Sequence, residues 1–228
     1  TLLDESGRVV RPVIMWADNR SISQARWLQQ QYGEQIFTIS YQPVHASWTL
    51  AQLLWIRQNE PHVWQHIRRI MLCKDYITYR LTGSWQTDSY DAMGTQLLDV
   101  SQRIWSKDLA DLIDLPLDYL PPLRNPTDVA GVVSPQAAEE TGLLAGTPVA
   151  VGSGDSVVEA LGAGVIEPGQ CIVKLATSGT VNVVGAEPRP HHKVMTYCHV
   201  VPNRWYTITA INYAAAAVRW FTETFSTY

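Results

Sequence analysis

The 228-residue sequence predicts an α/β protein. Apolar, β-branched segments alternate with segments of helical pattern up to about residue 165, which is typical of α/β architecture. Near Pro168 the pattern changes and strand-like segments dominate, so we expect a domain boundary there. Hydrophobic residues make up 46% and charged residues 17% of the chain, a composition that favours a well-packed globular protein over a disordered one.

The first segments predict a strand followed by a helix. Val9–Trp16 is apolar and β-branched, and Pro12 favours an edge position because proline has no backbone donor for the ladder. Asp18 or Ser21 is the expected cap of a helix that runs to about residue 32. Gly33 is the expected end of this helix.

The alternation continues through the rest of the chain. Thr49-Leu50-Ala51-Gln52 has the capping-box form and predicts a helix start, and Pro61 predicts another. Ile67–Leu72 predicts a strand, and Lys74–Leu81 predicts a helix that Gly83 ends. The remaining expectations are a helix from Ser106 through Ile113, a loop over 114–125, a helix over 135–141 ended by Gly142, a buried strand over 149–151, a helix over 156–161, a hairpin of 171–175 with 181–184, a strand over 205–211 and a final helix over 213–228.

Charge, cysteine and histidine patterns exclude several function classes. The formal net charge of -4 is scattered without a basic stripe, which argues against nucleic acid as a partner. No apolar run approaches the roughly 20 residues of a membrane helix. The three cysteines, Cys73, Cys171 and Cys198, are far apart and predict a reduced cytoplasmic protein. The six histidines form no nucleophile triad and no metal set, so we expect no protein metal site.

The segment 149–164, V-A-V-G-S-G-D-S-V-V-E-A-L-G-A-G, is the most distinctive in the chain. A short strand delivers Asp155 at its carboxyl end, where ligand sites gather in open α/β sheets. The preceding glycines allow close approach of a backbone or a substrate. A carboxylate there accepts a proton from a substrate hydroxyl, but aspartate is also a favoured helix cap. Both interpretations of Asp155 stay open on the local pattern.

Three other segments are weaker candidates. Lys174–Thr180, K-L-A-T-S-G-T, offers hydroxyls and backbone donors to an anion such as phosphate, or forms an ordinary hairpin turn. Asp18 and Arg20, in W-A-D-N-R, suit hydrogen bonds to sugar hydroxyls, pairing with each other, or capping of the next helix. The polar segment 88–95 suits either the lining of a cleft or a solvated turn. For each of the three, the structural alternative is favoured on local pattern alone.

In order along the chain, six segments resemble FGGY carbohydrate kinases, with xylulokinases as the closest branch. The segments are W-A-D-N-R at 16–20, S-W-T-L-A-Q-L-L-W-I-R-Q-N at 47–59, K-D-Y-I-T-Y-R-L-T-G at 74–83, D-S-Y-D-A-M-G-T-Q-L-L-D-V at 88–100, G-S-G-D-S-V-V-E-A-L-G-A-G at 152–164 and L-A-T-S-G-T at 175–180. Each is weak alone, but six in the family's order over nearly the whole chain make a strong resemblance.

The resemblance implies ribonuclease-H-like lobes of the actin/hexokinase superfamily, with a sugar and ATP bound between them. It implies an ATP-dependent kinase for a sugar or polyol, first a ketopentose such as xylulose, using Mg²⁺. The implied site residues are Asp155 as catalytic base, Ser156, Ser47, Trp48, Asp18 and Arg20 for the sugar, and Thr177, Ser178, Gly179 and Thr180 near the phosphates. Kinases for ribulose, gluconate, glycerol or an autoinducer-like polyol, and a non-catalytic sugar-binding relative, are the alternatives.

Three residues differ from those usual in the family, and two of the family's nucleotide-binding motifs do not occur in this sequence. Gln52 stands where family members usually have Lys, Ala176 where they have Gly, and Ser156 where xylulokinases often have Asn. Neither a D-x-G-T phosphate loop nor a Gly-rich adenosine motif occurs in the sequence. We therefore expect an incomplete chain, with the later part of the first, sugar-binding lobe over 1–166 and the opening of the second, ATP-binding lobe over 167–228. A small-molecule sugar is the expected partner, and a homodimer is an open alternative for the assembly.

Overall fold

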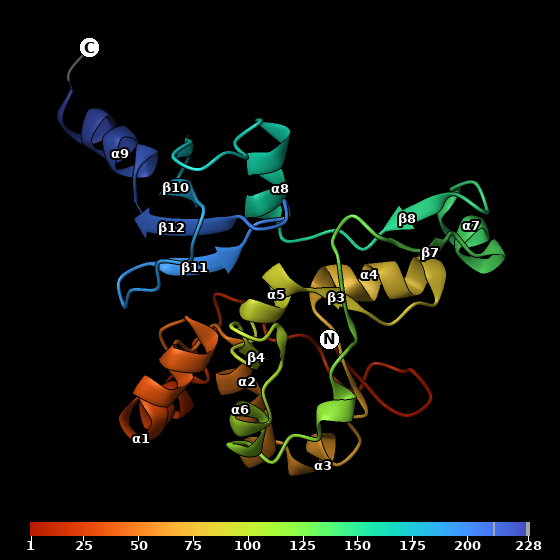
Figure 1. Cartoon of the computed structure of the whole chain (residues 1–228). Helices are drawn as coiled ribbons and strands as arrows, with labels where there is room; N and C mark the ends of the chain where they lie inside the picture. The colour runs from red at the N-terminus through yellow and green to blue at the C-terminus, as the bar shows by residue number, and fades with distance from the viewer. Residues whose placement is uncertain (212, 227–228) are drawn as a thin grey trace. The chain divides into compact units, whose positions relative to one another are not determined.

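The computed structural model describes residues 1–211 and 213–226. The chain divides into two compact units, residues 1–154 and residues 155–228 (Figure 1). The first unit combines helices with short two-stranded sheets, whereas the second is built on one four-stranded sheet. The predicted division of the lobes at residue 166 stays a prediction.

The first unit is mainly helical. Its helices are α1 (Ile22–Ser40), α2 (Thr49–Asn59), α3 (Pro61–Trp64), α4 (Cys73–Thr82), α5 (Ser89–Met93), α6 (Lys107–Asp111), the 3₁₀ helix η1 (Leu117–Tyr119) and α7 (Pro135–Thr141). Its strand pairs are β1 (Leu2–Leu3) with β2 (Arg69–Ile70), β3 (Thr87–Asp88) with β6 (Leu123–Arg124), β4 (Leu98–Asp99) with β5 (Ile104–Trp105), and β7 (Val129–Val132) with β8 (Pro148–Ala150). The β3–β6 pair is parallel and the other three pairs are antiparallel.

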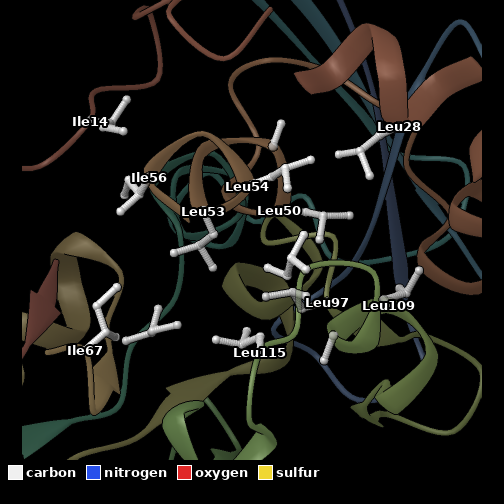
Figure 2. Close-up of a cluster of buried hydrophobic side chains, with 14 of the residues drawn as sticks. Ile14, Leu28, Leu50, Leu53, Leu54, Ile56, Ile67, Leu97, Leu109 and Leu115 are labelled. Carbon is white, nitrogen blue, oxygen red and sulfur yellow. The ribbon is translucent and has the colours of Figure 1, made fainter. Parts of the chain in front are cut away.

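The core of the first unit forms around α2. Leu50, Leu53 and Leu54 of this helix are nearly inaccessible to solvent, and Leu97 and Leu109 pack in the same cluster (Figure 2). Burial of each such side chain contributes about 1.5–3 kcal/mol. The cluster therefore holds α2 and the start of α6 together, which gives the polar segments around them a rigid support.

The second unit consists of an antiparallel sheet and two helices. Its strands are β9 (Cys171–Leu175), β10 (Gly179–Gly185), β11 (Met195–Cys198) and β12 (Trp205–Ile211), in the order β11-β12-β10-β9. Gly179 pairs with Leu175 on one side and with Ile211 on the other, so β9 and β10 form the predicted hairpin. The helices are α8 (Asp155–Gly162) and α9 (Ala215–Phe225). The final helix thus ends at Phe225, and the predicted positions 227–228 lie outside the described residues.

Several helix ends follow the predicted residues. Gly83 ends α4 with φ of 78°, and Gly142 ends α7 with φ of 77°. This left-handed conformation favours glycine because it has no Cβ. The Ser106 hydroxyl accepts a hydrogen bond from Leu109 N and caps α6, which stops at Asp111, before the predicted end at Ile113.

The predicted end of the first helix at Gly33 is wrong. Helix α1 continues through Gly33 to Ser40 and ends at Tyr41, which has a left-handed φ of 58°. Glycine within a helix costs about 1 kcal/mol relative to alanine. Full burial of Ile36 in the added turns offsets that cost. Ser21 is the N-cap residue, but its hydroxyl donates to Ala46 O instead of accepting from the helix.

Five further predictions about local structure are corrected. Residues 9–16 form no strand, and Val9 makes only an isolated bridge with Leu3. Pro12 has no backbone N–H to donate, so it interrupts the hydrogen-bond ladder that a strand over these residues would need. Thr49 does not cap α2, because it is already the first helical residue and Trp48 is the N-cap.

The strand expected to be buried at 149–151 is β8, and it is largely exposed; only Val151, just after it, is buried. The predicted strand over 67–72 is limited to Arg69–Ile70. The predicted loop over 114–125 contains η1 and β6.

Candidate functional site

The segment from Val151 to Gly154 is a tight turn held by backbone contacts. Val151 N donates to Asp128 O and Gly152 N donates to Pro126 O, both at 2.9 Å. Gly152 has φ of 72°, a conformation that a residue with a Cβ rarely adopts. At Gly154 an added Cβ would lie 2.3 Å from Tyr90 Cε1, so only glycine fits there without movement.

Asp155 follows this turn as the first residue of α8, and it is exposed. Its Oδ1 accepts a hydrogen bond from the backbone N of Ser156 at 2.7 Å. The carboxylate therefore lies at the amino end of a helix, where backbone donors favour negative charge. This position is compatible with both interpretations of Asp155, as a base and as a helix-terminal residue, so its catalytic role stays a prediction.

Helix α8 is fixed against the sheet of its own unit. Val157 and Ala160 are fully buried, and the Tyr206 hydroxyl of β12 donates to Ser156 O at 3.0 Å. Burial raises the pKa of Tyr206 to about 12, so the hydroxyl stays a donor at neutral pH. Lys174 of β9 pairs with Glu159 of α8 at 2.7 Å. These contacts hold the helix that begins at Asp155.

A buried charged cluster lies beside the turn of residues 152–154, and we call it the Lys74 cluster. It consists of Lys74 and Asp75 from the first turn of α4, with Asp88 and Asp91 from β3 and α5. Lys74 Nζ lies 2.6 Å from Asp75 Oδ1, 3.0 Å from Asp88 Oδ1 and 3.4 Å from Asp91 Oδ2. The side chains of Asp75 and Asp88 are only 2% and 1% exposed. The cluster thus combines one partly buried cation with three carboxylates, two of which are almost fully buried.

Burial shifts the titration of these groups. It raises the pKa of Asp91 to about 7, and the negative charge of Asp88 adds to the effect against the attraction of Lys74. Burial also raises the pKa of Asp75, although Lys74 opposes it. Burial acts to lower the pKa of Lys74, but the three carboxylates outweigh it, so that pKa is raised. Lys74 therefore stays charged, while Asp91 gains or loses its proton near neutral pH.

The Lys74 cluster is joined to the turn through Asp88. Asp88 Oδ2 accepts a hydrogen bond from Ser153 Oγ at 2.6 Å and another from Tyr90 N at 3.0 Å, the second of which caps α5. Asp91 Oδ1 lies 3.0 Å from the position of a Cβ on Gly154. Segments far apart in the sequence, around residues 74, 88 and 153, therefore meet at one place within the first unit.

A cavity of about 490 Å³ in the first unit is lined by two of the predicted sugar-binding residues, Ser47 and Trp48. Trp48 Nε1 donates to Pro43 O at 3.0 Å, which orients the indole ring. Gln52, also in the lining, donates through Nε2 to Ser47 O at 3.2 Å. The cavity combines an apolar ring with a hydroxyl. These two groups suit the apolar faces and the hydroxyl groups of a sugar.

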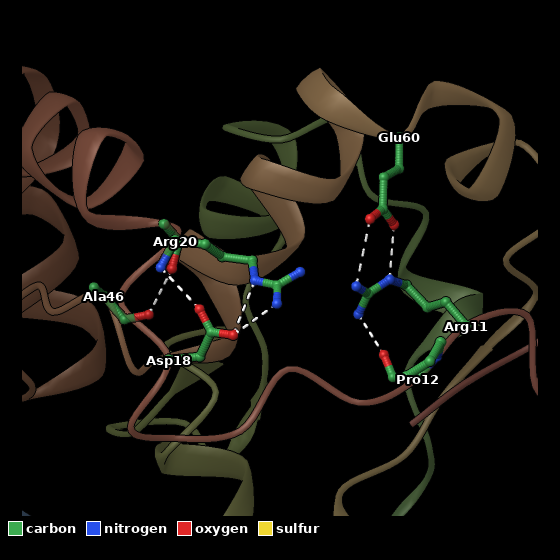
Figure 3. A network of polar contacts seen from close by, with 7 residues as sticks. Arg11, Pro12, Asp18, Arg20, Ala46 and Glu60 are labelled. Atoms are coloured by element: carbon green, nitrogen blue, oxygen red, sulfur yellow. Dashed lines mark hydrogen bonds and ion pairs between the residues drawn. The ribbon is translucent and has the colours of Figure 1, made fainter.

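Asp18 and Arg20 are placed differently from Ser47 and Trp48. They pair with each other on the surface, with Arg20 Nη2 at 2.8 Å from Asp18 Oδ2 (Figure 3). The guanidinium carbon of Arg20 also lies 5.0 Å from the centroid of the Trp55 ring. Neither residue lines the 490 Å³ cavity. The same view shows the ion pair of Arg11 with Glu60, at 2.7 Å. The predicted contact of Asp18 and Arg20 with sugar stays a prediction.

The predicted phosphate segment is the turn between β9 and β10. Thr177 and Ser178 are exposed in the turn, whereas Gly179 is buried. Ala214 N, at the start of α9, donates to Thr177 O at 2.9 Å, and a Cβ on Gly179 would lie 3.0 Å from Ala214 Cβ. Thr180 Oγ1 is buried and has no hydrogen-bond partner among the described residues. Of the four predicted phosphate-site residues, Thr177–Thr180, only Thr177 and Ser178 are therefore exposed.

Residues 1–162 match the model of the N-terminal domain of the FGGY family of carbohydrate kinases. The chain belongs to the FGGY family. Xylulose kinase of Escherichia coli K12 is 34% identical over 222 residues, which are 96% of this chain and 46% of that protein. The crystal structure of xylulose kinase from Rhodospirillum rubrum matches with a TM-score of 0.93 at 29% identity, over 97% of this chain and 46% of that one.

Xylulose kinase of Bacillus subtilis is 32% identical, over 99% of this chain and 46% of that protein. The FGGY chain therefore spans about half the length of the curated relatives that it matches. Its likeness to sugar-kinase structures confirms the predicted fold class, the α/β fold of the actin/hexokinase superfamily. Among the described residues, none of the helices has the length and apolar character that a membrane crossing requires.

Sequence reasoning missed the Lys74 cluster. The segments 74–83 and 88–100 carry the resemblance to the family, and the local pattern of 88–95 suits either a cleft lining or a solvated turn. A signal was present, because K-D and D-x-x-D place four charges in segments that also carry apolar residues at buried positions. Their convergence depends on tertiary folding, which local pattern does not describe.

Proposed function

We propose that the protein of which these residues form part is an ATP-dependent sugar kinase, and that its substrate is a ketopentose, first of all xylulose. The main support is family membership together with similarity to xylulose kinases along nearly the whole chain. The exposed Asp155, which follows a turn with glycine at positions 152 and 154, adds a group suited to the chemistry.

In this proposal Asp155 is the general base. Its carboxylate accepts the proton of a sugar hydroxyl, and the oxygen attacks the γ-phosphorus of ATP while the bond to the β-phosphate oxygen breaks. Ser156, the next residue, would hydrogen-bond the sugar, and Ser47 and Trp48 would line the sugar pocket. Phosphoryl transfer depends mainly on positioning and electrostatics, so rigid placement of Asp155 is part of the catalytic requirement.

ATP would be held in part by the turn between β9 and β10. The exposed hydroxyls of Thr177 and Ser178 suit phosphate oxygens, and the start of α9 lies beside the same turn. Among residues 1–211 and 213–226, no group of three His, Cys, Asp or Glu side chains is placed to hold a metal. Mg²⁺ bound mainly through substrate phosphates needs no such group, so in our proposal it arrives with ATP as the Mg-ATP substrate.

Formation of ADP by the full-length protein with a panel of sugars and polyols tests the proposal. The panel contains xylulose, ribulose, gluconate and glycerol at equal concentrations. We expect the highest kcat/KM with xylulose. Preference for another member of the panel would replace the substrate, and absence of phosphorylation with all of them would contradict the kinase function. The cytoplasmic compartment and the homodimer stay predictions.

A further inference from the structure

Ser153 contributes the only side chain of the turn Gly152-Ser153-Gly154. Its hydroxyl donates to Asp88 Oδ2 at 2.6 Å, a short distance for a hydrogen bond to a carboxylate. Asp88 belongs to β3 and the cap of α5, 65 positions earlier in the chain. This bond therefore joins the turn to a distant element of the same unit.

Asp88 is itself held in one position. Its side chain is 1% exposed, its Oδ1 lies 3.0 Å from Lys74 Nζ, and its Oδ2 also accepts from Tyr90 N at 3.0 Å. A carboxylate with a cation on one oxygen and two donors on the other has little freedom to rotate. Ser153 thus donates its hydrogen bond to a carboxylate that is itself held in place.

Steric contact constrains the turn as well. The α carbon of Gly154 lies so close to α5 that an added Cβ would lie 2.3 Å from Tyr90 Cε1. Movement toward α5 is blocked by this contact, while movement away requires the loss of the bond from Ser153 to Asp88. The last residue before Asp155 is therefore held in both directions.

We propose that Ser153, held by Asp88 and Lys74, is a positioning residue that fixes the backbone from which Asp155 extends during phosphoryl transfer. The inference rests on the proposed function, because it assigns a catalytic consequence to the anchor. Asp155 is bonded to Gly154, so a loosened turn displaces the carboxylate without changing its chemistry. A displacement near 1 Å costs up to about 100-fold in rate.

Kinetics of Ser153→Ala in the full-length protein are the first test. We expect kcat with xylulose to fall by roughly 10- to 100-fold with little change in the KM for sugar. Ser101→Ala is the matched control, since Ser101 Oγ also donates to an aspartate, Asp99, at 2.7 Å on an exposed turn. If Ser153 acts only through Asp155, Ser153→Ala causes no further loss in an Asp155→Asn background. A normal kcat in a folded Ser153→Ala variant, or a full additional loss in that background, overturns the inference.

Hydrogen exchange separates this inference from the proposed function. We expect faster amide exchange over residues 152–156 in Ser153→Ala than in wild type, and wild-type rates there in Ser101→Ala, because only the first loses the anchor. Unchanged exchange in Ser153→Ala overturns the anchor even if the protein is an active kinase. A protein that shows faster exchange but phosphorylates no sugar contradicts the proposed function, and with it the positioning role, while the anchor itself stands.

Discussion

Replacement of Asp91 by Asn is expected to change how stability depends on pH. Burial, with the charge of Asp88, raises the pKa of Asp91 from 3.8 to about 7 in the folded protein. Between these two pH values the folded state holds a proton that the unfolded state has released. The free energy of unfolding therefore falls as the pH rises from about 4 to about 7, because over that range the folded state binds one proton more than the unfolded state. Asn removes the titration and resembles protonated Asp in shape.

The size of the effect follows from the size of the shift. One pKa unit corresponds to about 1.4 kcal/mol, so the full shift corresponds to roughly 4 kcal/mol. The Asp91 side chain is 18% exposed and lies 3.4 Å from Lys74 Nζ, so relaxation and screening reduce the effect. We expect about 2 kcal/mol, which is about 4–8 °C in melting temperature for a domain of 150–250 residues.

The assay is thermal unfolding of wild type and Asp91→Asn from pH 5 to pH 8. The melting temperature of Asp91→Asn should increase relative to that of wild type as the pH rises, and the difference between the two should level off above pH 7. Asp118→Asn, at an exposed position of η1, is the control and should follow the wild-type curve. A difference between Asp91→Asn and wild type that is constant or shrinks with rising pH would refute the proposed titration.

Three other substitutions test the site in the full-length protein. Gly154→Ala should lower both kcat and melting temperature, since its Cβ would lie 2.3 Å from Tyr90 Cε1; wild-type values of both would contradict the tight approach. Trp48→Ala should raise the KM for sugar by more than the KM for ATP, measured by varying each in turn, because Trp48 lines the 490 Å³ cavity; equal changes would remove that cavity as the sugar pocket. Ala176→Gly should keep or raise kcat, because glycine relaxes the turn proposed to bind phosphate, and a large loss of kcat would show that Ala176 is a specific adaptation.

Local signals predicted those parts of the fold that depend on backbone conformation. Gly83 and Gly142 end their helices as expected, because each adopts a left-handed conformation there. Gly33 gives the same signal but lies inside α1, where burial of Ile36 outweighs the glycine penalty. Local sequence shows a glycine but not which of its neighbours become buried. Only the tertiary structure therefore distinguishes a glycine that ends a helix from one that lies inside a helix.

The candidate site shows the same limit. Asp155 was predicted from a strand, two glycines and a helix in sequence, all of them local features. Ser153 received no role, because its partner Asp88 is 65 positions away. The local pattern includes the pairing of Asp18 with Arg20 as one alternative, since the two residues are two positions apart. Contacts between neighbours in sequence were thus within reach of prediction, and those between distant segments were not.

The Asp155→Asn substitution in the full-length protein tests the central claim most directly. Asn keeps the shape of the side chain and its ability to hydrogen-bond, but an amide is a very weak base. If Asp155 is the base, kcat with xylulose falls by about 10²–10⁴-fold while sugar binding, measured by calorimetry, stays close to wild type. Asp108→Asn, an exposed position in the first turn of α6, should leave kcat at the wild-type value. A stably folded Asp155→Asn variant with near-normal kcat would contradict the account, since Asn and Asp serve about equally well at a helix start.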